Sequence, residues 1–147
     1  MSAALPPRMT FVTLGARDVP KLRAFYERLG FPLAIADGDT FASFVVGGVI
    51  LALFQRDLLR EEAEAGDLPD AGWSGVSLAI NVDEKEQVDA AYEAAVAAGA
   101  TPIYAPRDRP YGPRSGYVAD PEGNRWEIAW APGIAFDARG AVTKFGD

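Results

Sequence analysis

One order of elements, a strand followed by a helix and three further strands, occurs twice along this sequence of 147 residues. The first copy is expected to have a helix between the N-cap Asp18 and Gly30, with strands at 10–15, 33–36, 41–46 and 49–55. The second is expected to have a helix from about 84 to Gly99, with strands at 75–82, 101–105, 116–119 and 125–130. This repetition predicts an α+β fold of two βαβββ modules.

The remaining residues are expected to connect or extend the two copies. Residues 56–74 are rich in acids and read as a solvated linker with a short helix, and 133–147 form a tail with a weak strand at 141–145. The loop at 106–114 is long for a hairpin, which is typical of functional loops and of plain surface loops alike. We expect one domain over 1–147, made of module 10–55, linker 56–74, module 75–132 and tail 133–147.

The run at 125–130 alternates between a large apolar face and a mixed face. Trp126, Ile128 and Trp130 share one side, which needs a core to cover it, whereas Glu127 lies on the other. The carboxylate of Glu127 therefore lies either on the surface or in a pocket. The turn before this strand, at 120–124, contains proline and glycine, as tight turns commonly do.

The charge balance excludes several classes of partner. The net charge is −7 and the pI is about 4.6, so nucleic acid and anionic membrane surfaces are poor partners for this chain. No apolar run approaches membrane-spanning length, and the first ten residues lack the charged and apolar regions of a signal peptide. A soluble, cytoplasmic protein is expected. The lack of cysteine removes disulfides and thiolate chemistry.

The chain also contains no histidine. Histidine is the commonest general base near neutral pH and the commonest protein ligand of zinc and similar metals. A serine–histidine–aspartate triad cannot form within this chain. Any bound metal would have to take oxygen ligands.

Several short motifs, in order inside the repeated unit, resemble the vicinal oxygen chelate superfamily, which includes glyoxalase I, the bleomycin-resistance proteins and the extradiol dioxygenases. They are VTLGARD at 12–18, AFY at 24–26, LGF at 29–31 and GYVADPEGN at 116–124, followed by Trp126 and Glu127. The likeness covers roughly 8–132 and is strongest to uncharacterised, glyoxalase-like bacterial members. It implies two paired modules whose mixed sheets curl around a shared cavity.

In metal-dependent members the resemblance implies one ligand on the first and last strand of each module, usually His or Glu. The matching positions here are Phe11, Ala52, Ser77 and Glu127. Only Glu127 ligates a divalent metal well, and a transition-metal site normally needs three or four protein ligands. We therefore expect no metal and no other cofactor.

Strand alternation gives the face that would line the shared cavity. Its members are small, apolar or hydroxylated apart from one acid: Phe11, Thr13, Ala52 and Phe54 from the first module, and Ser77, Ala79, Glu127 and Ala129 from the second. The alternate residues of the same strands, such as Leu14, Leu53 and Ile128, should pack under the helices. Tyr111, Arg114 and Trp73 are candidates for the cavity rim.

Glu127 has three interpretations: a remnant that only pairs with Arg114 or Arg125, an anchor for a ligand, or a general base in apolar surroundings. Arg114 has two: a surface or salt-bridge arginine, which is favoured slightly, or a group that binds a substrate carboxylate or phosphate. Tyr111 and Trp73 fit packing better than recognition.

Three functions follow from these residues. The first is a metal-free homodimer that binds a small, partly apolar molecule in the cavity between modules. The alternative is a lyase, isomerase or dioxygenase of the same superfamily that uses Glu127 as base or an atypical carboxylate metal site. The third is a non-catalytic module that binds a partner through the acidic segment 61–70, and the charge of this segment is the only feature that supports it.

Overall fold

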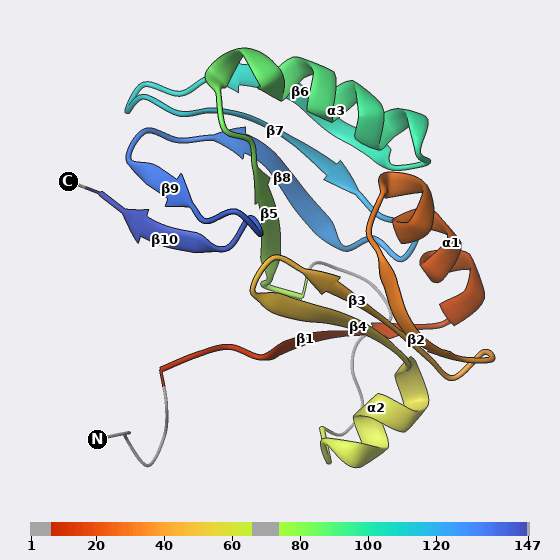
Figure 1. Cartoon of the computed structure of the whole chain (residues 1–147). Coiled ribbons are helices and arrows are strands. Elements are labelled where there is room, and N and C mark those ends of the chain that lie inside the picture. The colour runs from red at the N-terminus through yellow and green to blue at the C-terminus, as the bar shows by residue number, and fades with distance from the viewer. Residues whose placement is uncertain (1–6, 66–73, 147) are drawn as a thin grey trace, which may run out of the picture.

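The computed structural model describes residues 7–65 and 74–146. They form two four-stranded mixed sheets, three α-helices and a C-terminal hairpin (Figure 1). The first sheet has the order β1-β4-β3-β2, and its strands are β1 (Phe11–Ala16), β2 (Leu33–Asp37), β3 (Phe41–Val46) and β4 (Val49–Gln55). The second has the order β5-β8-β7-β6, and its strands are β5 (Ser77–Asn81), β6 (Thr101–Asp108), β7 (Arg114–Ala119) and β8 (Arg125–Trp130).

The two sheets have the same internal pairing. In each, the first strand runs parallel to the last, and the other neighbours are antiparallel. Thr13 pairs with Ala52 on β1 and β4, and Ala79 pairs with Glu127 on β5 and β8, so the two copies match in register as well as in order. The predicted α+β fold of two βαβββ modules is confirmed.

Each module carries one long helix. In the first, α1 (Val19–Leu29) begins where the Asp18 side chain accepts the N–H of Lys21 at 3.1 Å, and it ends at Gly30, whose φ of 103° is left-handed. In the second, a 3₁₀ turn (Lys85–Gln87) leads into α3 (Val88–Ala97). A short helix, α2 (Arg56–Glu62), follows β4 directly, close to the short helix expected in the linker.

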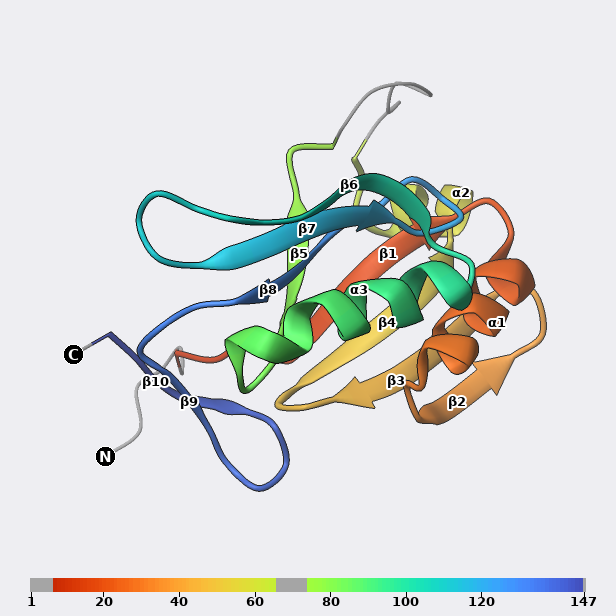
Figure 2. The ribbon, with the colours of Figure 1, turned by 90° about the horizontal axis from the view of Figure 1, so that it is seen from above.

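The sheet faces covered by α1 and α3, called the helix-bearing faces below, share a single core. It contains Leu14, Leu51 and Leu53 from the first sheet together with Val118, Trp126 and Ile128 from the second, as the alternation predicted for most of these positions. Both helices contribute to it, and Arg28 of α1 donates from Nε to the carbonyl of Ala98 just after α3, at 2.8 Å. Figures 1 and 2 accordingly show α1 beside the C-terminal end of α3.

This arrangement decides where the opposite sheet faces point. Because both helix-bearing faces are turned into one core, the face expected to line a cavity points outward in each module. Phe11, on the outward face of β1, is 52% exposed, and Ser77 and Ala79 on β5 are exposed as well. Within one chain the two outward faces therefore do not enclose a cavity together. They are referred to below as the outward faces of the first and second sheet.

The second module differs from the prediction at its hairpin. β6 extends to Asp108 and β7 begins at Arg114, so the expected loop at 106–114 is reduced to residues 109–113. Cross-strand pairing of Arg107 with Ser115 and of Asp108 with Arg114 extends the ladder past Pro106, which lies at a bulge where no N–H is needed.

The tail also forms more structure than expected. The predicted strand appears as β10 (Val142–Phe145), but it pairs with β9 (Ile134–Phe136), which the sequence did not indicate. Three residues with little alternation give no strand signal, and the hairpin is fixed instead by its turn. There Asp137 accepts the N–H groups of Ala141 and Arg139, and these bonds lower the pKa of its carboxyl. No helix in the described ranges is long and apolar enough to cross a membrane.

Candidate functional site

A cavity of about 320 Å³ opens on the outward face of the second sheet. Its lining combines aromatic, aliphatic, hydroxyl and guanidinium groups: Ser77, Ile103, Tyr104, Tyr117 and Arg125. All four strands of the sheet contribute, and Ser77 Oγ donates to the Tyr117 hydroxyl at 3.1 Å. Apolar walls with a few polar groups are the usual composition of a small-molecule site.

Irregular pairing of β6 gives this cavity its side chains. Strict alternation would place Tyr104 and Arg107 on opposite faces, because they are three residues apart. The register of β6 against β7 shifts between Pro102 and Tyr104 and again between Tyr104 and Arg107. The second shift brings Arg107 over the ring of Tyr104, with its guanidinium carbon 4.3 Å from the ring centroid. Such bulges commonly redirect a side chain next to a functional site.

Gly116 makes the second shift sterically feasible. A Cβ at this position would lie 2.7 Å from the backbone nitrogen of Pro106 and 2.9 Å from the carbonyl oxygen of Tyr104. Both contacts are with backbone atoms, which cannot move aside as the end of a side chain can. The glycine of the GYVADPEGN motif is thus required by the close approach of β6 to β7.

Arg109 completes the cluster from the hairpin loop. Its Nε donates to the buried Ser115 hydroxyl at 3.1 Å, and its Nη2 donates to the Tyr104 hydroxyl. Its guanidinium carbon also lies 5.1 Å from the Tyr104 ring centroid. Tyr104 packs against Tyr117 with centroids 5.4 Å apart. Arg107, Arg109, Tyr104 and Tyr117 therefore form one continuous group, called the Tyr–Arg cluster below.

Glu127 is half-buried on the same outward face. It lies directly across from Tyr117 on β7 and from Ala79 on β5. The pairing partners considered for it are engaged elsewhere, since Arg114 bonds Asp89 and Arg125 Nη1 donates to the Gly123 carbonyl at 2.8 Å. Within 7–65 and 74–146 no salt bridge involves Glu127.

The residues at the four expected metal-ligand positions do not fit a divalent transition metal. Phe11 and Ala52 have no ligating atoms, and the Ser77 hydroxyl is a weak ligand already bonded to Tyr117. In the described part of the chain, no three Asp or Glu side chains lie close enough together to hold an ion. Glu127 alone contributes one carboxylate, which is too few ligands for a transition-metal centre.

The first-module candidates lie on the outward face of the other sheet. Phe11 and Thr13 are exposed, Ala52 is buried, and the half-buried Phe54 ring packs edge-on against Phe41, with centroids 6.1 Å apart. None of these residues lines the cavity on the second sheet. The structure thus brings Ser77 and Glu127 to one face of one module and leaves the first-module residues apart from them.

Two rim candidates also lie away from the cavity. Arg114 ion-pairs with Asp89 of α3 at 2.7 Å and with Asp108 at 3.2 Å, so it serves as a salt-bridge arginine, although with partners other than those considered from the sequence. The hydrogen bond from Arg114 is the main cause of a lowered pKa of Asp108. Tyr111 is 79% exposed at the hairpin loop. Trp73 lies outside the described residues.

A second cavity of about 700 Å³ lies between the modules, beside the C-terminal hairpin. Its walls include Val12, Leu51 and Trp126 from the helix-bearing faces together with Ile134 and Phe136 of the hairpin. Of the residues expected to line the shared cavity, Ala79 alone among the described ones lines it.

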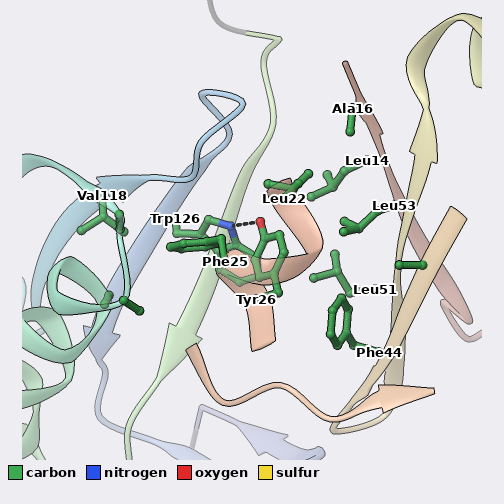
Figure 3. Close-up of a cluster of buried hydrophobic side chains, with 14 of the residues drawn as sticks. Leu14, Ala16, Leu22, Phe25, Tyr26, Phe44, Leu51, Leu53, Val118 and Trp126 are labelled. Atoms are coloured by element: carbon green, nitrogen blue, oxygen red, sulfur yellow. Dashed lines mark hydrogen bonds between the residues drawn. The ribbon is translucent and has the colours of Figure 1, made fainter. Parts of the chain in front are cut away.

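A buried hydrogen-bonded group joins the two modules. The Tyr26 hydroxyl of α1 donates to Asp120 Oδ2 at 2.5 Å. It also accepts from Trp126 Nε1 at 3.0 Å, the bond drawn as a dashed line in Figure 3. Burial, and next the adjacent Asp120 carboxylate, raise the pKa of Tyr26 far above its ordinary value. Asp120 also accepts the N–H groups of Glu122 and Asn124, so the AFY and GYVADPEGN motifs meet here in a structural role.

The family model for the Glyoxalase/Bleomycin resistance protein/Dioxygenase superfamily matches residues 8–128. The chain belongs to this superfamily. Among solved structures it is similar to a glyoxalase-related enzyme from Fulvimarina pelagi, with 31% identity, a TM-score of 0.82, and coverage of 93% of this chain and 97% of that one.

Two further glyoxalase-superfamily structures align at lower identity. A glyoxalase/bleomycin resistance protein/dioxygenase family enzyme from Burkholderia phytofirmans PsJN has 28% identity and a TM-score of 0.71, covering 82% of this chain and 96% of that one. A lactoylglutathione lyase from Agrobacterium tumefaciens has 25% identity and a TM-score of 0.67, covering 86% and 96%. A search of curated proteins found no match.

The sequence prediction missed most of the cavity lining. Ile103, Tyr104, Tyr117 and Arg125 line the cavity but were not among the candidate residues. Tyr117 and Arg125 could have been found, because alternation from Glu127 and antiparallel pairing place both on the outward face. The positions of Ile103 and Tyr104 depend on irregular pairing in β6, for which the sequence carries no comparable signal.

Proposed function

We propose that this superfamily member binds a small, partly apolar molecule on the outward face of its second sheet, without a metal ion. The observation that carries the proposal is the set of residues at the four positions where the resemblance implies metal ligands. Phe11 and Ala52 hold two of these positions on the first sheet, and neither can ligate a metal. Ser77 and Glu127 hold the other two on the second sheet, where an aromatic cavity of about 320 Å³ lies beside Glu127.

We further propose that a second copy of the chain closes the site. The outward faces cannot meet within one chain, but a two-fold dimer can place the first sheet of one copy over the second sheet of the other. The first sheet offers an apolar surface for this contact, since Phe11, Val45 and Ile35 lie on the same sheet face and are 52%, 51% and 62% exposed. Contiguous exposed apolar side chains commonly mark an interface.

The dimer is tested by light scattering coupled to size exclusion. The wild-type protein should elute with twice the chain mass, and Phe11→Arg should shift the population toward monomer. Phe145→Arg is the matched control, because Phe145 is 74% exposed but lies on β10. A monomeric wild-type protein at micromolar concentration would remove this part of the proposal.

Ligand binding is tested by equilibrium dialysis after the protein has been stripped with EDTA. A panel of aromatic and aliphatic metabolites and antibiotics, each at up to high micromolar concentration, should yield at least one ligand. That ligand should be lost in Tyr117→Ala and retained in Tyr92→Ala, which removes a tyrosine from α3. If nothing in the panel bound, or if binding required added metal, the proposed function would be wrong.

A second candidate function is catalysis with Glu127 as general base. It is favoured by one observation: Glu127 lies directly across from the cavity residue Tyr117 and takes part in no salt bridge within the described residues. Glu127→Gln keeps the shape and removes the proton acceptor. Loss of turnover of a bound ligand with affinity retained would support catalysis, whereas unchanged ligand chemistry in the variant would exclude it.

A further inference from the structure

We propose that the cavity on the second sheet selects organic anions, specifically a carboxylate attached to a flat, apolar body. This inference rests on the proposed function, since it takes the cavity as the ligand site and adds the chemical class of the ligand. It is carried by three arginines: Arg125 lines the cavity, and Arg107 and Arg109 lie against the ring of the lining residue Tyr104.

The charges of these arginines are not neutralised by acids. In the described part of the chain, no carboxylate lies within 4 Å of Arg107, Arg109 or Arg125. Their neighbours are instead neutral: hydroxyls for Arg109, an aromatic face for Arg107 and a backbone carbonyl for Arg125.

That pattern is unexpected in so acidic a protein. The chain has 21 acidic and 14 basic residues, and Arg23, Arg60 and Arg114 all ion-pair with nearby acids. On the outward face of the second sheet, by contrast, the three arginines face one carboxylate, Glu127, and none of them ion-pairs with it among the described residues. A group of guanidinium ions with a net positive charge at a concave surface attracts an anion.

The geometry favours a carboxylate held by Arg109. Two of its nitrogens are anchored to Ser115 and Tyr104, which fixes the plane of the guanidinium, and its other N–H groups have no hydrogen-bond partner among the described residues. A planar guanidinium donates two parallel hydrogen bonds to a carboxylate. Because Ser115 is 1% exposed, this anchor is set by the fold and does not depend on a mobile surface group.

The body of the ligand is indicated by the remaining lining. Tyr104 and Tyr117 present tilted rings, and Ile103 adds an aliphatic surface that is 43% exposed. Such walls favour a flat, aromatic body over a flexible sugar or peptide. A phosphate ester on the same body would share the anionic chemistry, so the test must separate the two.

The test uses four compounds with one ring system: 2-naphthoate, 2-naphthamide, 2-naphthyl phosphate and 2-naphthylammonium. Titration calorimetry at low salt should give naphthoate at least tenfold tighter binding than the amide and no binding of the cation. Naphthoate affinity should fall as sodium chloride is raised, because salt screens the attraction. A phosphate that binds at least tenfold tighter than naphthoate would overturn the carboxylate assignment.

Arginine variants decide whether the cluster is responsible. Arg109→Gln and Arg107→Gln should each weaken the binding of naphthoate at least fivefold and change the affinity for naphthamide by less than twofold. Arg107 has no hydrogen bond to lose among the described residues, so its variant stays informative if Arg109→Gln disturbs the loop. Arg23→Gln on α1, which breaks only the ion pair with Glu27, is the matched control and should leave both affinities unchanged.

Two failures are distinguishable. Equal binding of naphthoate and naphthamide, unaffected by the arginine variants, would overturn the anion inference and leave the proposed binding function intact. No binding of any of the four compounds, in a protein that also binds nothing in the wider panel, would overturn both.

Discussion

Tyr26→Phe tests whether the buried hydroxyl, rather than the ring, holds the two modules together. The substitution keeps the ring that stacks on Phe31 with centroids 5.6 Å apart and planes 8° from parallel. It removes the donor to Asp120 and the acceptor of the Trp126 indole N–H. Packing alone would therefore predict almost no change in stability.

The hydrogen bonds of the Tyr26 hydroxyl predict a large loss of stability in Tyr26→Phe. A hydrogen bond to a charged group is worth about 1.5–3 kcal/mol, and a buried N–H left without a partner costs about 1–3 kcal/mol. Asp120 keeps the backbone N–H groups of Glu122 and Asn124 and the Asn124 side-chain amide as donors, which limits the loss at the carboxylate. We expect a decrease in the free energy of unfolding of about 2–4 kcal/mol.

Urea unfolding followed by tryptophan fluorescence measures this decrease. With an m-value of about 2 kcal/mol per molar urea, the midpoint should fall by about 1–2 M while the m-value is unchanged. Tyr92→Phe is the control, because Tyr92 is also in the core at 8% exposure but its hydroxyl has no hydrogen-bond partner among the described residues. If Tyr26→Phe were as stable as Tyr92→Phe, the hydroxyl would not be what stabilises the junction.

Three further results are expected. Because the pKa of Tyr26 is raised in the folded protein, the native state holds one more proton than the unfolded state above a pH of about 10. The free energy of unfolding should therefore fall with pH there by about 1.4 kcal/mol per pH unit more steeply in wild type than in Tyr26→Phe. Urea midpoints across pH 8–12 measure this difference, and parallel curves for the two proteins would contradict it. Gly116→Ala should lower the free energy of unfolding in urea by about 1–3 kcal/mol and abolish naphthoate binding, because the new Cβ has no room. Gly48→Ala should lower it less, and equal losses in the two variants would refute the steric explanation. Arg114→Gln should raise the pKa of Asp108 toward its ordinary value in an NMR titration and leave naphthoate affinity unchanged, and a loss of affinity would place Arg114 in the site after all.

The sequence predicted the modules well because their signals are local. Alternation at 125–130 placed Trp126 and Ile128 in the core, and the first helix begins after Asp18 and ends at Gly30, as expected. Even the matching of the two copies was correct, with Ala52 and Glu127 at equivalent register positions. These features depend on side-chain period and capping, which neighbouring residues determine.

The site was harder to predict because it depends on long-range contacts. The outward orientation of both cavity faces results from packing the two helix-bearing faces into one core, which strand periodicity cannot reveal. The Tyr–Arg cluster depends on two register shifts in β6, the second of them opposite Gly116. Arg114 was considered for the site from its place in a long loop, but extension of β6 and β7 shortens that loop and leaves Arg114 beside Asp89 of α3.

We propose that the ligand site of this superfamily member works without a metal ion. Untagged protein, incubated with Mn, Fe, Co, Ni and Zn and then desalted, should retain far less than one equivalent of any of them by inductively coupled plasma mass spectrometry, and Glu127→Ala should behave identically. Near-stoichiometric metal in wild type that disappears in Glu127→Ala would contradict the account and make a carboxylate-bound metal the basis of function.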